Sequence, residues 1–288
     1  MKIRFIINPI SGTKKQKGIE DVIKNHINFL YEIVYTKKGG DATELSQKAI
    51  SDKVDVVVAI GGDGTVNECA KALIGSNTAM GVIPCGSGNG FAYHIGMEKD
   101  IKKAIIQLNN CRIQTIDSCS ANGIPFVNIS GIGFDAHIAN LFANFRKRGF
   151  VSYFKLIVKE LSYKAQKYTL NFDGKSKTIT AYLIAFANCS QYGNDFQISP
   201  LAKMEDGLID IVIIKDFPKW KIPAFLLRIA KGKVHLSEYV EIIQCKEMTI
   251  ETTNSLVHVD GEPIELKSPI IVKVKPKTLK IFLPNGKK

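Results

Sequence analysis

The chain has 288 residues, 45% of them hydrophobic, which suffices for one large domain or two ordinary domains with sizeable cores. Its longest apolar stretches have the length of strands, so the sequence predicts neither a signal peptide nor a membrane-spanning segment. Six cysteines lie without CxxC spacing, which argues against a disulfide framework or a zinc site and favours a reducing, cytoplasmic setting.

Charge is the strongest compositional feature, because 39 Lys and Arg against 27 Asp and Glu give a net charge of +12. Basic residues concentrate in segments 144–177 and 215–233, and the second segment contains the only tryptophan, Trp220. Such segments predict binding to polyanions or to an anionic membrane surface. A solvated, lysine-rich face without any partner is the commoner explanation of charge alone.

The first third of the chain alternates strands with helices. Strands are expected at 2–8, 31–36, 54–60 and 80–84, and helices at about 19–30, 41–51, 65–74 and 98–108. Alternation at this pitch predicts crossover units around a parallel sheet with helices on both faces, a three-layer α/β domain. Ligands of such sheets bind at the carboxyl ends of the strands.

A polar, glycine-containing loop follows each of these four strands. The third loop, GGDGT at 61–65, lies between a β-branched run and a helix. Glycine lets a ligand approach backbone N–H groups closely, and the following helix points its positive end at that ligand. The loop therefore favours an anion such as phosphate. A lone loop of this kind is about as often only a tight turn from a strand to a helix.

From about Cys111 the pattern changes to β-branched runs separated by turn residues. Strands are expected at 112–118, 178–187, 208–214, 248–252 and 270–274, and helical segments near 154–161 and 218–231. This pattern predicts a mostly β second domain, either a sandwich or an open barrel, so the fold class is α/β followed by β. We expect the domains at 1–120 and 121–278, with the tail 279–288 able to join the first domain.

Six motifs follow one another along the chain: NPISG at 8–12, GGDGTVNE at 61–68, IPCGSGN at 83–89, GIGFDA at 131–136, SPLAKMEDGLID at 199–210 and DGEP at 260–263. Together they resemble the diacylglycerol kinase and sphingosine kinase superfamily of lipid kinases, most closely its soluble bacterial branch. The resemblance covers residues 3 to about 283. It implies an enzyme of two domains that binds ATP and Mg²⁺ on the first domain and admits a lipid alcohol to a cleft between the domains.

The resemblance also implies a nucleotide site. Its residues would be Asn8, Ser11, Gly12, Thr36, Gly61, Gly62, Asp63, Gly64, Thr65, Asn67, Ser87, Gly88, Asn89, Arg146 and Arg148. The residue types agree, since phosphoryl transfer needs chiefly backbone donors, a metal ion and cationic clamps. Asp63 would be the carboxylate linked to Mg²⁺, the cap of the following helix, or both. Solvation of a helix surface explains the two arginines nearly as well.

The attacking hydroxyl needs a general base to accept its proton. The bacterial enzymes suggest Asp260 or Glu262, which follow a short apolar strand and precede a turn expected to contain Pro263. Two carboxylates close together can also tune one of them for that task. The sphingosine kinase branch places the base at Asp63 instead. As an isolated motif, DGE is more often an ordinary type I turn.

The resemblance implies roles for two further groups of residues. Lys203, Asp206 and Leu208 match positions that hold a structural Mg²⁺ through carbonyls and one carboxylate, while a turn at Asp206-Gly207 is the alternative. Asp135 resembles the aspartate with which sphingosine kinases hold the polar head of the lipid.

The loop after the fourth strand departs from the diacylglycerol kinase pattern. Gly90 follows Asn89, and Tyr93 stands where arginine is common. The sequence GSGN is closer to the motif of sphingosine and ceramide kinases. The resemblance therefore implies that the acceptor is either a diacylglycerol-like or a sphingoid-like lipid. Cys85 in the same loop is a candidate reactive thiol, although most such cysteines are simply small apolar residues.

The predicted function is that of a cytoplasmic, ATP- and Mg²⁺-dependent lipid kinase that touches a membrane surface transiently. Trp220, Phe217 and Phe225 fit such contact, although core packing explains at least two of the three more simply. We expect no nucleic-acid partner and allow for a homodimer. The alternatives are an NAD kinase, which shares GGDGT but is disfavoured by GSGN, GFDA and DGLID, and a non-catalytic module that binds lipids or polyanions.

Overall fold

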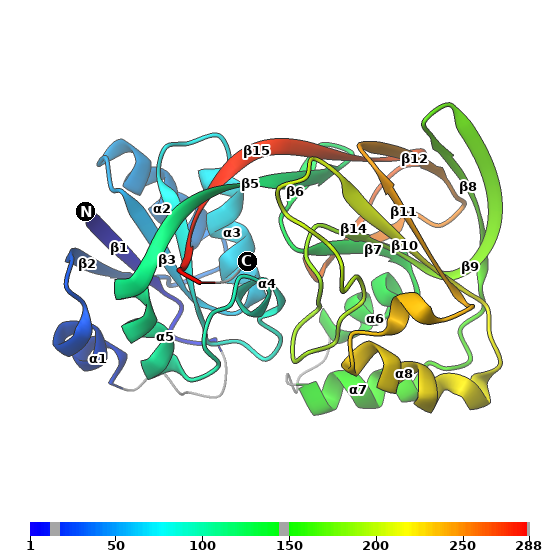
Figure 1. Cartoon of the computed structure of the whole chain (residues 1–288), viewed down its shortest axis with the longest axis horizontal. Helices are drawn as coiled ribbons and strands as arrows, with labels where there is room; N and C mark the ends of the chain where they lie inside the picture. The colour runs from blue at the N-terminus through cyan, green and yellow to red at the C-terminus, as the bar shows by residue number, and fades with distance from the viewer. Residues whose placement is uncertain (12–17, 144–149, 287–288) are drawn as a thin grey trace. The chain divides into compact units, whose positions relative to one another are not determined.

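The chain divides into two compact units. The first comprises Met1–Ile116 and Lys277–Lys288, and the second comprises Asp117–Pro276. The computed structural model in Figure 1 describes residues 1–11, 18–143 and 150–286. Two long strands, β5 (Cys111–Ala121) and β15 (Ile270–Pro284), contribute residues to both units.

Unit 1 is built on a parallel sheet. Its strands are β1 (Lys2–Ile7), β2 (Leu30–Tyr35), β3 (Val56–Gly61) and β4 (Ala79–Pro84), in the order β4-β3-β1-β2. The end of β15 runs parallel to β4, with Ile281 opposite Met80. Every residue of β3 and β4 is buried. Continuous apolar strands of this kind are typical of a parallel sheet that is covered on both faces.

Helices form the outer two layers of unit 1. They are α1 (Ile19–His26), α2 (Asp41–Ser51), α3 (Asp63–Leu73), α4 (Gly90–His94), α5 (Ile101–Gln107) and the 3₁₀ turn η1 (Leu108–Asn110). The strand order reverses after β2, so right-handed crossovers put α1 on one face and α2 and α3 on the other. Accordingly α1 packs against α5, and α2 packs against α3. The predicted α/β domain is confirmed.

Unit 2 is a β-rich body. In its main antiparallel path β14 (Glu262–Glu265), β13 (Leu256–Val259), β7 (Ile129–Gly133), β9 (Lys175–Ala187), β8 (Gln166–Phe172), β12 (Glu247–Glu251) and β15 are successive neighbours. Four strands lie off this path: β10 (Ile209–Lys215) pairs with β9 and with β11 (Val240–Cys245), and β6 (Ile124–Phe126) pairs with β5. The predicted mostly β second domain is confirmed.

Strand β10 of unit 2 buries both of its faces. In β10, Ile211 and Ile213 belong to one apolar core, while Val212 and Ile214 belong to another. Because successive side chains of a strand point to opposite faces, the two cores lie on opposite sides of the sheet. The second core also includes residues of the helices α6 (Phe134–Ala143), α7 (Phe150–Lys159) and α8 (Ile222–Ala230), which gather on that side (Figure 1).

Some elements differ from the sequence expectation. The helix expected at 19–30 ends at His26, because Ile27 is extended with φ −86° and ψ 127°. The segment 218–231 contains a 3₁₀ turn, η2 (Lys219–Lys221), before α8, and another, η3 (Val234–Leu236), follows it. Within the described residues, no helix combines the length and the apolar character that a membrane span requires.

Candidate functional site

The carboxyl ends of the unit 1 strands carry the glycine-containing loops. Backbone hydrogen bonds hold these loops against the neighbouring strands: Asn8 N–H donates to Ile60 at 3.0 Å, and Cys85 N–H donates to Gly61 at 2.9 Å. The loops after β1, β3 and β4 therefore meet along one edge of the sheet, which we call the rim.

Asp63, the first residue of α3, connects the loops after β3 and β4. Its Oδ2 accepts from Asn89 N–H at 2.9 Å, and its Oδ1 accepts from Gly90 N–H at 3.1 Å. Asn89 is the N-cap of α4, so the carboxylate caps α4. The expectation that Asp63 caps its own helix is wrong, because that helix begins at Asp63 and its N-cap is Gly62. The role of Asp63 at a metal ion stays a prediction.

Two glycines let the same loops approach each other closely. A Cβ on Gly86 would lie 2.5 Å from Gly62 Cα, which is too close for any side chain. Asn89 has a left-handed backbone (φ 58°), and its amide side chain closes the loop by accepting from Gly86 N–H and donating to Gly86 O, both at 2.8 Å. The two loops can therefore touch this closely only because position 86 lacks a side chain, while a Cβ on Gly62 would come within 3.3 Å of Gly86 Cα.

The loops after β1 and β2 join the rim through both side-chain and backbone hydrogen bonds. Asn8 Nδ2 donates to Thr65 Oγ1 at 3.0 Å, and Thr36 N–H donates to the last residue of β1 at 3.0 Å. The Glu68 carboxylate accepts from Gly40 N–H at 3.0 Å and from Ala42 N–H at 3.1 Å, which fixes the start of α2. Glu68 lies inside the GGDGTVNE motif, but the sequence analysis gave it no role.

The structure brings most of the predicted nucleotide-site residues to this rim. They are Asn8, Ser11, Thr36, Gly61, Gly62, Asp63, Gly64, Thr65, Asn67, Ser87, Gly88 and Asn89. Ser87 is exposed, whereas Thr36, Thr65 and Asn67 are buried. The remaining three, Gly12, Arg146 and Arg148, lie outside the described residues.

In unit 2, Asp260 and Gly261 form the turn between β13 and β14. Both have positive φ, 49° and 89°, as in the two-residue type I′ turns that join hairpin strands. The alternative of an ordinary type I turn is therefore wrong. The expectation of a turn that contains Pro263 is also wrong, because Pro263 lies in β14 opposite His258. As β14 ends the main strand path, a proline there breaks no inner hydrogen-bond ladder.

The two candidate bases differ in environment. Asp260 is buried, and each of its carboxylate oxygens accepts a backbone N–H, from Val127 at 3.0 Å and from Asn128 at 2.9 Å. Glu262, at the start of β14, is exposed. The structure thus holds the Asp260 carboxylate in one orientation, while Glu262 faces solvent.

Asp135 lies in the first turn of α6 and is buried. Its Oδ1 accepts from Ala136 N–H at 2.8 Å, and its Oδ2 accepts from the Tyr192 hydroxyl at 3.0 Å. His258 Nε2 lies 3.0 Å from the same Oδ2. Much of the acceptor capacity of Asp135 is therefore used inside unit 2.

The predicted metal-binding residues Lys203, Asp206 and Leu208 lie in one turn before β10. The exposed Asp206 accepts from Leu208 N–H at 3.0 Å, so the turn proposed as the alternative is present. A buried residue that sequence analysis missed, Asp117, supports this turn by accepting from Gly207 N–H at 2.8 Å. Across the part of the chain that is described, no group of three or more His, Cys, Asp or Glu side chains forms a metal site.

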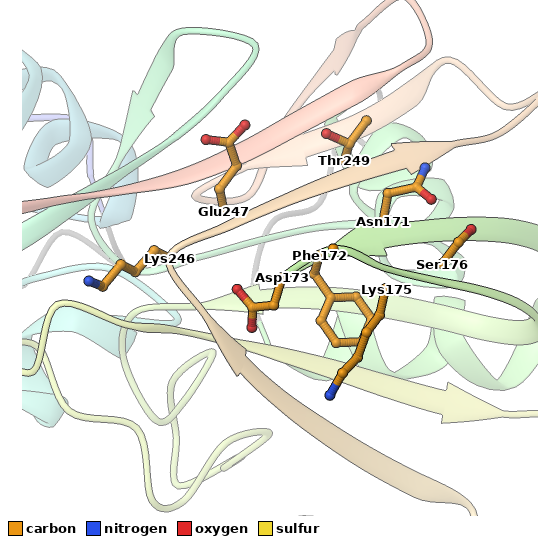
Figure 2. Close-up of a pocket in the computed structure, with 9 residues that line it drawn as sticks. Asn171, Phe172, Asp173, Lys175, Ser176, Lys246, Glu247 and Thr249 are labelled. Atoms are coloured by element: carbon orange, nitrogen blue, oxygen red, sulfur yellow. The ribbon is translucent and has the colours of Figure 1, made fainter.

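An open depression of unit 2 lies elsewhere, at the turn between β8 and β9 (Figure 2). Charged side chains of both signs, among them Asp173, Lys175, Lys246 and Glu247, surround it. Its described lining includes none of the predicted site residues, so we do not treat it as the functional site.

Comparison with known proteins identifies the family. Residues 2–121 match the family described as "Diacylglycerol kinase catalytic domain", and residues 128–283 match "YegS C-terminal NAD kinase beta sandwich-like domain". The chain therefore belongs to the diacylglycerol kinase family of lipid kinases, which confirms the predicted enzyme class. The second description relates the fold of residues 128–283 to NAD kinases.

Individual relatives agree with this assignment. The chain is 30% identical over 236 residues to "Probable lipid kinase YegS-like" of Chromohalobacter salexigens, covering 79% of this chain and 76% of the relative. It is 29% identical to a diacylglycerol kinase of Mycobacterium tuberculosis, covering 98% and 95%. A crystal structure of "a putative diacylglycerol kinase" from Bacillus anthracis superposes with a TM-score of 0.80 at 25% identity, covering 99% and 95%.

The contact between the two glycine loops can be tested by adding one methyl group. Gly86→Ala would force a Cβ against Gly62 Cα, so we expect the free energy of unfolding to fall by about 2 kcal/mol in urea denaturation. Gly39→Ala is the control, because a Cβ there meets no atom within 4 Å. Equal stability of the two variants would contradict the close packing of the loops.

The candidate reactive thiol can be tested by chemical labelling. Burial raises the pKa of the Cys85 thiol to about 12, and its side chain is nearly inaccessible. At pH 8 only about one thiol in 10,000 is then ionised, so we expect native Cys85 to react with a disulfide reagent at least about 100-fold more slowly than free cysteine. Rapid labelling of the native protein that disappears in Cys85→Ser would contradict this.

Proposed function

We propose that this lipid kinase transfers the γ-phosphoryl group of ATP, with Mg²⁺, to a hydroxyl of a diacylglycerol-like or sphingoid-like lipid. The observation that carries the proposal is the rim of unit 1, where glycine loops meet without intervening side chains beside the N-terminus of α3. Unit 1 would supply the donor site, and unit 2 the acceptor site.

The residues of the rim fit a nucleotide polyphosphate. Gly62 and Gly64 are partly exposed and leave their backbone N–H groups open to close approach, whereas the buried Gly61 makes room for the Thr65 side chain. The eleven-residue helix α3 adds its positive end. Asn8 and Ser87 would add side-chain donors. Arg146 and Arg148, outside the described residues, stay proposed as phosphate clamps.

Oxygen donors suited to Mg²⁺ lie in both units. The two amide hydrogen bonds to Asp63 orient its carboxylate at the N-terminus of α3, and carboxylate oxygens are ligands that Mg²⁺ prefers, so Asp63 would hold the ion at the donor site. In unit 2, the Asp206 carboxylate with the carbonyls of Lys203 and Leu208 would hold a structural ion. A bound Mg²⁺ supplies neutralisation of the phosphate charge.

We propose Asp260 as the base that accepts the proton of the lipid hydroxyl, with Glu262 as the second candidate. The amides of Val127 and Asn128 hold the Asp260 carboxylate in place, and an ionised carboxylate can accept a proton. Asp135 stays proposed for the polar head of the lipid, which it would reach with its remaining acceptor capacity or through Tyr192.

Transient contact with a membrane surface belongs to the same proposal. Near α8, Trp220 is 77% exposed and Leu227 is 54% exposed, and basic residues flank both of them in sequence, Lys219 and Lys221 beside Trp220 and Arg228 beside Leu227. Apolar and basic side chains in this combination favour an anionic lipid surface. The other two aromatic residues of this segment pack against each other, with ring centroids 4.8 Å apart, and belong to the core.

The function is tested by incubating the purified protein with labelled ATP, Mg²⁺ and either mixed lipids or NAD. Label in the organic phase supports the lipid kinase, and label on NAD would indicate an NAD kinase. Label on neither would indicate a module that only binds. Separate assays with diacylglycerol and with a long-chain base decide between the two acceptor classes.

The base is tested by Asp260→Asn, which keeps the shape of the side chain but removes its basicity. We expect kcat to fall by about 100-fold to 10,000-fold, with the KM for ATP nearly unchanged. Asp173→Asn is the matched control, because Asp173 also has positive φ (47°) and is followed by glycine in a hairpin turn. If Asp260→Asn, shown to be folded by circular dichroism, retained full turnover, Asp260 would not be the base.

A further inference from the structure

His258 is a buried residue of β13 that lies two positions before Asp260. Its ring contacts groups at both nitrogens. Nδ1 accepts from Gly261 N–H at 3.2 Å, and Nε2 lies 3.0 Å from Asp135 Oδ2. The ring therefore stands between the turn that carries the proposed base and a buried carboxylate.

The contact with Gly261 fixes the protonation of the ring. A backbone N–H can only donate, so Nδ1 must accept and carries no proton. The ring proton is then on Nε2, where it donates to Asp135. The hydrogen bonds run in one direction, from Gly261 to His258 and from His258 to Asp135.

The surroundings of Asp135 hold in place its carboxylate, which accepts the hydrogen bond from His258. Gly131 lies directly opposite His258 in the β7–β13 pairing, and a Cβ there would overlap Asp135 Oδ2 and come within 2.9 Å of Ile184 O. Position 131 thus leaves room for the carboxylate beside the ring. The Tyr192 hydroxyl, which donates to the same Oδ2, restrains that carboxylate further.

These contacts hold the turn from two sides, since backbone amides orient the Asp260 carboxylate and the His258 ring holds the next peptide N–H. We infer that His258, itself oriented by Asp135, is a positioning residue that sets the geometry of the Asp260-Gly261-Glu262 turn for proton acceptance. This inference rests on the proposed role of Asp260. Sequence analysis assigned His258 no role and gave Asp135 only the lipid head.

Two amide substitutions separate the two ends of the ring. His258→Asn keeps an acceptor near the position of Nδ1, whereas His258→Gln keeps a donor near the position of Nε2 and lacks the acceptor for Gly261. We expect kcat of His258→Gln and His258→Ala to fall by about 10-fold to 100-fold, with the KM for ATP unchanged. We expect His258→Asn to stay within about 3-fold of the unsubstituted protein.

The control is His137→Ala, which removes another histidine–carboxylate pair of unit 2, that with Glu160 at 3.0 Å, and should leave kcat unchanged. Full turnover in His258→Gln, or equal losses in His258→Asn and His258→Ala, would overturn the inference. If Asp260→Asn is inactive while all His258 variants are active, only the positioning role fails. If Asp260→Asn is active, the proposed base fails.

A spectroscopic measurement on the unsubstituted protein tests the inference without depending on whether a variant folds. The ¹⁵N shifts of the His258 ring should report a neutral imidazole with the proton on Nε2. A proton on Nδ1 would overturn the inference, because Gly261 N–H would then lack its acceptor.

Discussion

The rim of unit 1 depends on one carboxylate that accepts two backbone amides. Asp63 belongs to α3, yet its oxygens bind the amides that begin α4, and this brings the loops after β3 and β4 together. Glycine at position 86 permits that approach, because a Cβ there would lie 2.5 Å from Gly62 Cα. The result is an edge where backbone donors are close together and no side chain separates Gly62 from Gly86, which is the arrangement that a phosphate chain requires.

In unit 2 too, aspartate carboxylates accept hydrogen bonds from backbone amides of distant loops. Asp260 binds amides 132 and 133 residues away in the chain, and Asp117 binds the amide of Gly207, 90 residues away. Hydrogen bonds from an amide to a charged carboxylate are among the stronger ones in proteins, and they orient the acceptor as well as the donor. Each aspartate thus fixes a distant loop while its own carboxylate is held in a defined direction.

The sequence predicts features that depend on local periodicity. It does not predict features that depend on a hydrogen-bond partner or a neighbouring strand far along the chain. The helix 41–51 is predicted at its observed bounds, because its apolar spacing is contained within the segment. The five residues of α4 are too few to show such spacing. Asp117 and His258 could not be assigned, because their partners come from loops far along the chain, and Pro263 was misread because its position at a sheet edge is a property of the assembled sheet.

The central claim is that backbone amides of the loops after β3 and β4 hold the phosphates of ATP. Amide hydrogen exchange, followed by mass spectrometry with and without saturating ATP and Mg²⁺, tests it most directly. The account predicts slower exchange at 61–67 and 85–90 when nucleotide is present, with little change in α5, and loss of this protection in Asp63→Asn. Unchanged exchange in both loops at saturating nucleotide would contradict it.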